Sequence, residues 1–142
     1  MKVLVDTPIW SLALRRSPKD LGPVHSRFVE EFAELVRENR AEIIGPIRQE
    51  LLSGIREGSR FRSVRDHVRA FEDSLLTTED YEEAAQISNQ CRAAGISGSP
   101  VDFLICATAL RRRWQIFTLD KDFQEYARYL GIVLFVPRNR RP

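Results

Sequence analysis

Short apolar runs alternate with helical stretches along the whole chain. We expect strands at 2–5, 41–44, 74–76, 115–119 and 132–136. Helices are expected from Ile9, over 24–39, from Gly45, and over 60–73, 79–94, 99–110 and 120–130. Strands that alternate with helices form a parallel sheet that carries helices on both faces. The pattern therefore predicts an α/β domain with a small, mainly parallel sheet of about four or five strands.

The composition is that of one globular domain. A chain of 142 residues can bury a real core, and its 43% hydrophobic and 30% charged content argues against disorder. No apolar run approaches the roughly 20 residues that cross a bilayer. The first residues are typical of a strand rather than a signal peptide, so no membrane association and a cytoplasmic location are expected. We expect a single domain over 1–142, with a basic tail over 136–142.

The cysteines and histidines form no familiar metal or nucleophile motif. Cys91 and Cys106 are not a closely spaced pair, and both occupy apolar helical positions, which indicates reduced core residues. His25 and His67 lie far apart in charged stretches. This spacing argues against a helical zinc motif and against a histidine-based triad.

The stretch 99–110 is predicted to be a buried helix with a sharply defined start. Ser99 is a favourable N-cap, and Pro100 fits the first helical position because its missing N–H would be unpaired there. The residues that follow are apolar on nearly every side, which predicts burial. Asp102 in the first turn would be costly on such a helix unless it is paired or bound to a cation. The alternative is that Asp102 only favours the helix dipole.

Four acidic residues far apart in the sequence are predicted to meet at one edge of the sheet. Asp6 and Asp120 each follow a strand, whereas Glu50 and Asp102 are expected in the first turn of a helix, pointing inward. The carboxyl ends of parallel strands and the starts of the following helices share an edge, where α/β proteins bind ligands. The four carboxylates are therefore expected to converge there.

Converging carboxylates repel one another, so they either take up protons or bind a hard cation. Oxygen ligands without histidine or cysteine suit Mg²⁺ or Mn²⁺, which can activate water and neutralise charge on a phosphoryl oxygen. Asp122 is either a fifth acid or a helix cap. Thr7 and Thr118 either orient a water molecule or satisfy backbone groups at the strand ends.

These segments together resemble the PIN-domain ribonucleases, and closely the VapC toxins of bacterial VapBC toxin–antitoxin modules. The matching pieces are Val-Leu-Val-Asp6-Thr, Glu50, Ser-Pro-Val-Asp102-Phe-Leu-Ile-Cys-Ala-Thr-Ala-Leu and Thr118-Leu-Asp120-Lys-Asp122-Phe123, spread over 1–136. The resemblance implies a PIN-like three-layer α/β/α sandwich and a metal-dependent endoribonuclease toxin. It also implies that Asp6, Glu50, Asp102 and Asp120 are the catalytic and metal-binding acids.

The resemblance further implies an RNA substrate, a homodimer, and a small VapB-type antitoxin that wraps the toxin and blocks its site. One departure concerns Pro8, which stands where relatives often carry a serine hydroxyl. The role of that position in activity is therefore open.

Arginine supplies 19 of the 22 basic residues and is the better bidentate phosphate binder. Arg48 precedes Glu50 on its helix and is the arginine that we expect to contact RNA. The runs 111–113 and 138–141 are either solvated or form a nucleic-acid patch. Five large apolar residues near the N-terminus are either core or a surface for the antitoxin; they are Trp10, Leu12, Leu14, Phe28 and Phe32.

Two other functions fit the same architecture less well. A phosphoacceptor or phosphatase-like domain needs a second acid close to the first strand, but Asp6 is followed by Thr7 and Pro8. A catalytically inactive PIN-like module that acts through a protein partner would not need four mutually repelling acids. A metal titration distinguishes the inactive module from the nuclease.

Overall fold

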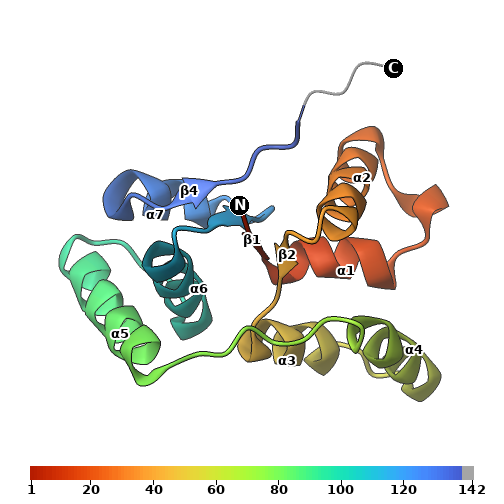
Figure 1. Cartoon of the computed structure of the whole chain (residues 1–142), viewed down its shortest axis with the longest axis horizontal. Helices are drawn as coiled ribbons and strands as arrows, with labels where there is room; N and C mark the ends of the chain where they lie inside the picture. The colour runs from red at the N-terminus through yellow and green to blue at the C-terminus, as the bar shows by residue number, and fades with distance from the viewer. Residues whose placement is uncertain (139–142) are drawn as a thin grey trace.

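A parallel sheet forms the centre of the fold. The computed structural model describes residues 1–138, and within that range the sheet has four strands in the order β2-β1-β3-β4 (Figure 1). All neighbouring pairs are parallel. The strands are β1 Val3–Val5, β2 Ala41–Glu42, β3 Gln115–Phe117 and β4 Val133–Leu134. β1 is buried on both faces, as apolar runs in parallel sheets are, and the predicted α/β class is confirmed.

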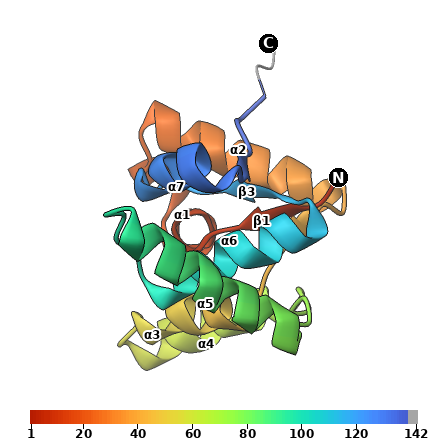
Figure 2. The same ribbon diagram turned by 90° about the vertical axis from the view of Figure 1, so that its left-hand side faces the viewer.

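Helices cover both faces of this sheet. Their bounds are α1 Thr7–Arg15, α2 Pro23–Arg37, α3 Gly45–Ser53, α4 Gly58–Val68, α5 Thr78–Ala93, α6 Pro100–Arg112 and α7 Asp122–Leu130, with a 3₁₀ turn at Pro18–Asp20. Figure 2 shows α2 and α7 on one side of the strands and α5 and α6 on the other. This arrangement is the three-layer sandwich expected from the sequence.

Helix α6 is the buried helix that the sequence predicts. Its residues from Phe103 to Ala109 are all buried. Ser99 is its N-cap, and the Ser99 hydroxyl accepts a hydrogen bond from the backbone N–H of Asp102 at 3.1 Å. The helix packs between α5 and β3, so its first turn is fixed relative to the sheet.

The predicted strand at 74–76 does not form. Ile43 and Asp73 make an isolated bridge instead, and Leu75 is 85% exposed. Instead of pairing with a neighbouring strand, two backbone carbonyls of this region accept hydrogen bonds from arginine side chains. Arg48 donates to the Phe71 carbonyl, and Arg112 donates to the Leu75 carbonyl. The predicted helix over 60–73 likewise ends at Val68.

The apolar residues near the N-terminus belong to the core. Trp10 is fully buried, its indole N–H donates to the Val5 carbonyl at 2.9 Å, and its ring packs edge-on against Phe32 and Phe71. Leu12 and Phe32 are buried, and Leu14 and Phe28 pack against the same core. Core packing therefore accounts for these five residues, and the alternative of an antitoxin surface gains no support from them.

Two of the basic runs are tied to acidic partners. Arg111 and Arg112 at the end of α6 both pair with buried Asp80 on α5. Asp80 also completes a capping box with Thr77, which is the N-cap of α5. Arg138 pairs with Glu31 and Glu38, joining the end of the described chain to α2. The rest of the predicted basic tail, 139–142, lies outside the described residues.

Cys91 and Cys106 are buried free thiols, as predicted. Burial raises the pKa of both thiols, so neither is a reactive thiolate at neutral pH. Across residues 1–138, no helix combines the length and apolar character needed to cross a membrane.

Candidate active site

The order in which strands are added to the sheet reverses between β1 and β3. From β1 the chain moves to β2 on one side, and it later returns to place β3 on the other side of β1. Open α/β sheets bind ligands in the crevice that such a switch leaves beyond the carboxyl ends of the strands. Asp6 directly follows β1, and Thr118 directly follows β3. The backbone N–H of Asp6 donates to the Phe117 carbonyl at 2.8 Å, which fixes the two strand ends side by side.

Asp6 is a buried carboxylate without a basic partner among the described residues; it is only 4% exposed. Its carboxylate accepts hydrogen bonds from the Thr7 backbone N–H at 2.8 Å and from the Thr118 hydroxyl at 2.7 Å. Burial, together with the charges of Asp102 and Glu50, raises the pKa of Asp6 to about 6, against the opposing effect of these hydrogen bonds. The site therefore holds a carboxyl that gains a proton more readily than an exposed aspartate.

Thr118 connects two of the predicted acids. Its hydroxyl donates to Asp6 and accepts from the backbone N–H of Asp120 at 3.0 Å. This is the backbone-satisfying role considered from the sequence. The hydroxyl of Thr7 is different, because it is buried and has no hydrogen-bond partner within 1–138. A buried hydroxyl without a partner is unusual and indicates an absent polar ligand or water.

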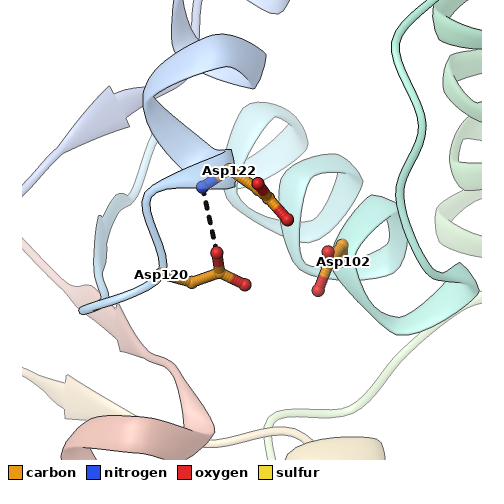
Figure 3. A group of neighbouring side chains, drawn as sticks. All are labelled: Asp102, Asp120 and Asp122. Atoms are coloured by element: carbon orange, nitrogen blue, oxygen red, sulfur yellow. Dashed lines mark hydrogen bonds between the residues drawn. The ribbon is translucent and has the colours of Figure 1, made fainter.

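Asp102, Asp120 and Asp122 form a cluster, which we call the acidic trio. One carboxylate oxygen from each lies within 4.8 Å of the others (Figure 3). Asp102 comes from the first turn of α6, Asp120 from the loop after β3, and Asp122 from the start of α7.

Of the two interpretations considered for Asp122, the structure supports the fifth acid. The Asp120 carboxylate accepts the Asp122 backbone N–H at 2.9 Å, so Asp122 is not the capping side chain. The carboxylate of Asp122 instead extends toward Asp102 (Figure 3).

Asp102 has a partner that sequence analysis missed. The hydroxyl of Tyr126 on α7 donates to Oδ2 of Asp102 at 2.9 Å. Asp102 is half-buried, and burial raises its pKa although the Tyr126 and Ser99 hydrogen bonds oppose the shift. A signal was present in the sequence: Tyr126 follows Phe123 by three residues on the apolar face of α7, and a buried tyrosine hydroxyl needs a partner.

Glu50 reaches the same edge less directly than predicted. It lies in the second turn of α3 and is exposed, so the predictions of a first-turn position and an inward side chain are wrong. The reason is that Ile47 and Leu51 occupy the buried face of α3. The charge of Glu50 still raises the pKa of Asp6, which places it near the site but outside the acidic trio.

The Arg48 side chain makes hydrogen bonds within the protein. Its guanidinium donates to Asp73 at 2.9 Å, to the Val68 carbonyl at 3.0 Å and to the Phe71 carbonyl. These bonds hold the segment after α4 against α3. The predicted RNA contact of Arg48 gains no support from this arrangement.

The donor set fits a hard divalent cation. Three aspartate carboxylates meet, backed by Asp6 and Glu50, and no histidine or cysteine shares the described cluster. Oxygen-only donors of this kind match Mg²⁺ or Mn²⁺, and a cation relieves the repulsion between the carboxylates. The unpartnered Thr7 hydroxyl is a further oxygen beside Asp6. The residues present therefore suit a metal centre rather than a structural ion-pair network.

Comparison with known proteins agrees with this architecture. The family model described as PIN domain matches residues 3–129. The structure of FitAcB from Neisseria gonorrhoeae is similar with a TM-score of 0.74 and 21% identity, covering 95% of this chain and 97% of that chain. VapBC2 from Rickettsia felis, bound to a DNA fragment from their promoter, is similar with a TM-score of 0.75 and 16% identity, covering 95% and 98%. A search of curated sequences found no match. At these identities the two structures establish the fold.

Proposed function

The chain belongs to the PIN domain family, and from that premise we propose that it is a divalent-metal-dependent endoribonuclease, the toxin of a type II toxin–antitoxin pair. The acidic trio at the switch point of the sheet is the observation that carries this proposal. PIN domains are in general nucleases, and carboxylate clusters in nucleases serve metal-assisted phosphodiester hydrolysis.

The proposed roles of the acids follow from their positions. Asp102, Asp120 and Asp122 would hold the ion, since their oxygens already converge. Asp6 would join them as a charged ligand, oriented by Thr7 and Thr118. Glu50, which is exposed at the rim, would add negative charge from α3. Bound Mg²⁺ or Mn²⁺ would supply an activated water and neutralise charge on the phosphate.

The proposed partners come from the family and from the similar structures. One of these is named VapBC2, which shares its name with the module that the sequence resembles. A small VapB-type antitoxin, a homodimer and a cytoplasmic location are therefore part of the proposal. The rival function is an inactive PIN-like module that acts only through its protein partner.

Cleavage of total cellular RNA by the purified protein tests the enzyme. Reactions contain Mg²⁺ or Mn²⁺, or EDTA, and compare the wild type with Asp102→Asn. Asp20→Asn is the matched control, because Asp20 is exposed on the 3₁₀ turn outside the acidic trio. We expect discrete fragments that need both metal and Asp102, and a loss of at least about 100-fold in Asp102→Asn.

Either of two results contradicts the proposal. Equal cleavage by wild type and Asp102→Asn would exclude this site as the catalytic centre. Absence of both RNA cleavage and Mn²⁺ binding in the wild type would favour the inactive module.

A further inference from the structure

Tyr126 is buried beside the acidic trio and has no role in the chemistry proposed above. Its side chain is fully buried, and its ring packs against Phe103 and Phe123 with centroid distances of 5.4 Å and 5.1 Å. Its hydroxyl lies 2.9 Å from Oδ2 of Asp102 and 3.3 Å from the Ser97 carbonyl oxygen. The hydroxyl has a single proton, and the shorter contact to a charged acceptor is the stronger one.

The hydrogen bond from Tyr126 restricts the side chain of Asp102, one member of the acidic trio. Oδ2 of Asp102 is held from the side of α7, so the carboxylate cannot rotate freely about its last bond. One oxygen of this carboxylate lies within 4.8 Å of a carboxylate oxygen of Asp120 and of one of Asp122 (Figure 3). A metal site depends on such outer contacts because they fix the direction of each ligand's lone pairs.

Gly98 makes the close approach of Tyr126 possible. A Cβ atom at position 98 would collide with the Tyr126 hydroxyl oxygen and would lie 2.8 Å from Cζ of Phe103. Both obstacles belong to packed aromatic rings that cannot move aside easily. The backbone of Gly98 does not have a positive φ, so the space, not the turn, excludes a side chain here.

We propose that Tyr126 is a positioning residue that holds Asp102 in its metal-binding orientation, and that Gly98 provides the space for it. The proposal rests on the proposed function, since it assigns a role within the same metal site. A purely structural role is the competing explanation, because any buried tyrosine hydroxyl needs an acceptor and the Ser97 carbonyl is one.

Tyr126→Phe separates the two roles, because it keeps the packed ring and removes only the hydroxyl. We expect its Kd for Mn²⁺, measured by electron paramagnetic resonance of the free ion, to rise roughly 10-fold or more. In RNA cleavage, kcat should fall by a similar factor while KM for RNA stays unchanged, since Tyr126 is buried and does not reach the substrate. Circular dichroism at the assay temperature should match the wild type.

Tyr129→Phe is the matched control. Tyr129 lies on the same helix, is 48% exposed, and directs its hydroxyl toward the Gln90 carbonyl at 3.4 Å. Removing that hydroxyl should leave Mn²⁺ affinity and cleavage at wild-type values.

Gly98→Ala reaches the same contact from the other side. The added methyl group displaces the Tyr126 hydroxyl, so Mn²⁺ affinity should again fall roughly 10-fold. If both substitutions act through the contact between Tyr126 and Asp102, the double variant should bind Mn²⁺ no more weakly than the weaker single variant. Additive losses would contradict a shared contact.

The outcomes separate this proposal from the proposed function. If the wild type binds no Mn²⁺, both fail together. If the wild type binds Mn²⁺ and Tyr126→Phe binds it equally well, the positioning role is overturned and the metal site stands. If Tyr126→Phe is unfolded at the assay temperature, the hydroxyl serves the fold, and the positioning role is again overturned. Weakened Mn²⁺ binding in a folded variant supports it even if no RNA is cut.

Discussion

Asp80 and Asp6 are two buried aspartates near helix starts, and their surroundings are opposite. Asp80 accepts hydrogen bonds from Arg111 and Arg112, and these arginines hold the pKa of its carboxyl well below the usual range. Asp6 is also buried, but among the described residues its carboxylate accepts hydrogen bonds only from the Thr7 backbone N–H and the Thr118 hydroxyl, and its pKa rises to about 6.

The difference separates a structural carboxylate from one that is suited to a ligand. Burying a charge is costly unless the fold supplies its counter-charge. At Asp80 the fold supplies two arginines, and the result is a permanent link between α5 and α6. At Asp6 the charges that act on it within residues 1–138 are themselves negative, and a bound cation is the counter-charge that we propose. Buried carboxylates of the second kind are the better markers of a cation site.

The largest effect is expected when the Asp80 link is broken. Asp80→Asn leaves Arg111 and Arg112 without their charged partner and should lower the free energy of unfolding by about 3 kcal/mol. Urea denaturation measures the loss. Asp66→Asn is the control, since Asp66 is exposed, its partner Arg65 is only partly buried, and the expected loss there is below about 1 kcal/mol. Equal losses in the two variants would remove the distinction between buried and exposed pairs.

Asp6→Asn should raise the free energy of unfolding, whereas Asp80→Asn lowers it. The Asp6 carboxyl holds its proton more tightly in the folded chain than in the unfolded one, so its ionisation destabilises the fold as pH rises from about 4 to about 6. Without divalent ions at pH 7, the variant should be more stable than the wild type by up to about 3 kcal/mol. Urea denaturation between about pH 4 and pH 7 measures the difference in free energy of unfolding between the variant and the wild type, which should vanish near pH 4.

Adding Mn²⁺ tests whether the charge of Asp6 serves a bound cation. A cation should stabilise the wild type at pH 7 by about 1.4 kcal/mol when its concentration is ten times Kd, and it should stabilise Asp6→Asn less. A loss of stability in Asp6→Asn at pH 7 without metal would show that the hydrogen bonds of Asp6 outweigh its charge.

The smallest effects concern the two threonines. Thr118→Val removes the donor to Asp6 and the acceptor for the Asp120 N–H, and it should lower the free energy of unfolding by about 1 kcal/mol. Thr7→Val removes a buried hydroxyl that has no partner within the described range, so stability should stay the same or rise slightly. Thermal unfolding without metal compares them, and a larger loss in Thr7→Val would mean that its hydroxyl is bonded in solution.

Local sequence signals predicted the fold and the edge of the sheet at which most of the candidate acids lie. The apolar run before Asp6 and the Ser99-Pro100 start of α6 are short-range signals, and the structure reproduces both. Because strand ends and helix starts meet at one edge of a parallel sheet, the sequence pattern predicts that Asp6, Asp102 and Asp120 lie at the same edge.

Contacts between distant segments could not be predicted in this way. Asp80 and its arginines are about 30 residues apart, and Arg48 and Asp73 are 25 apart. Only packing decides which arginine meets which acid, so neither the link to Asp80 nor the role of Arg48 was evident. The side chain of Glu50 was placed wrongly because its helix buries Ile47 and Leu51 on the adjoining face.

The strand order also governs when the site can assemble. β1 pairs with β3, and the Asp6–Thr118 hydrogen bond spans 112 residues. Contacts of such long range form late and slow the folding of a domain. A nascent chain that has not yet reached Thr118 has no strand beside β1 on that side, and Asp6 lacks its hydroxyl partner. During synthesis the acids therefore stay apart until nearly the whole domain has been made, which delays any activity until the chain is almost finished.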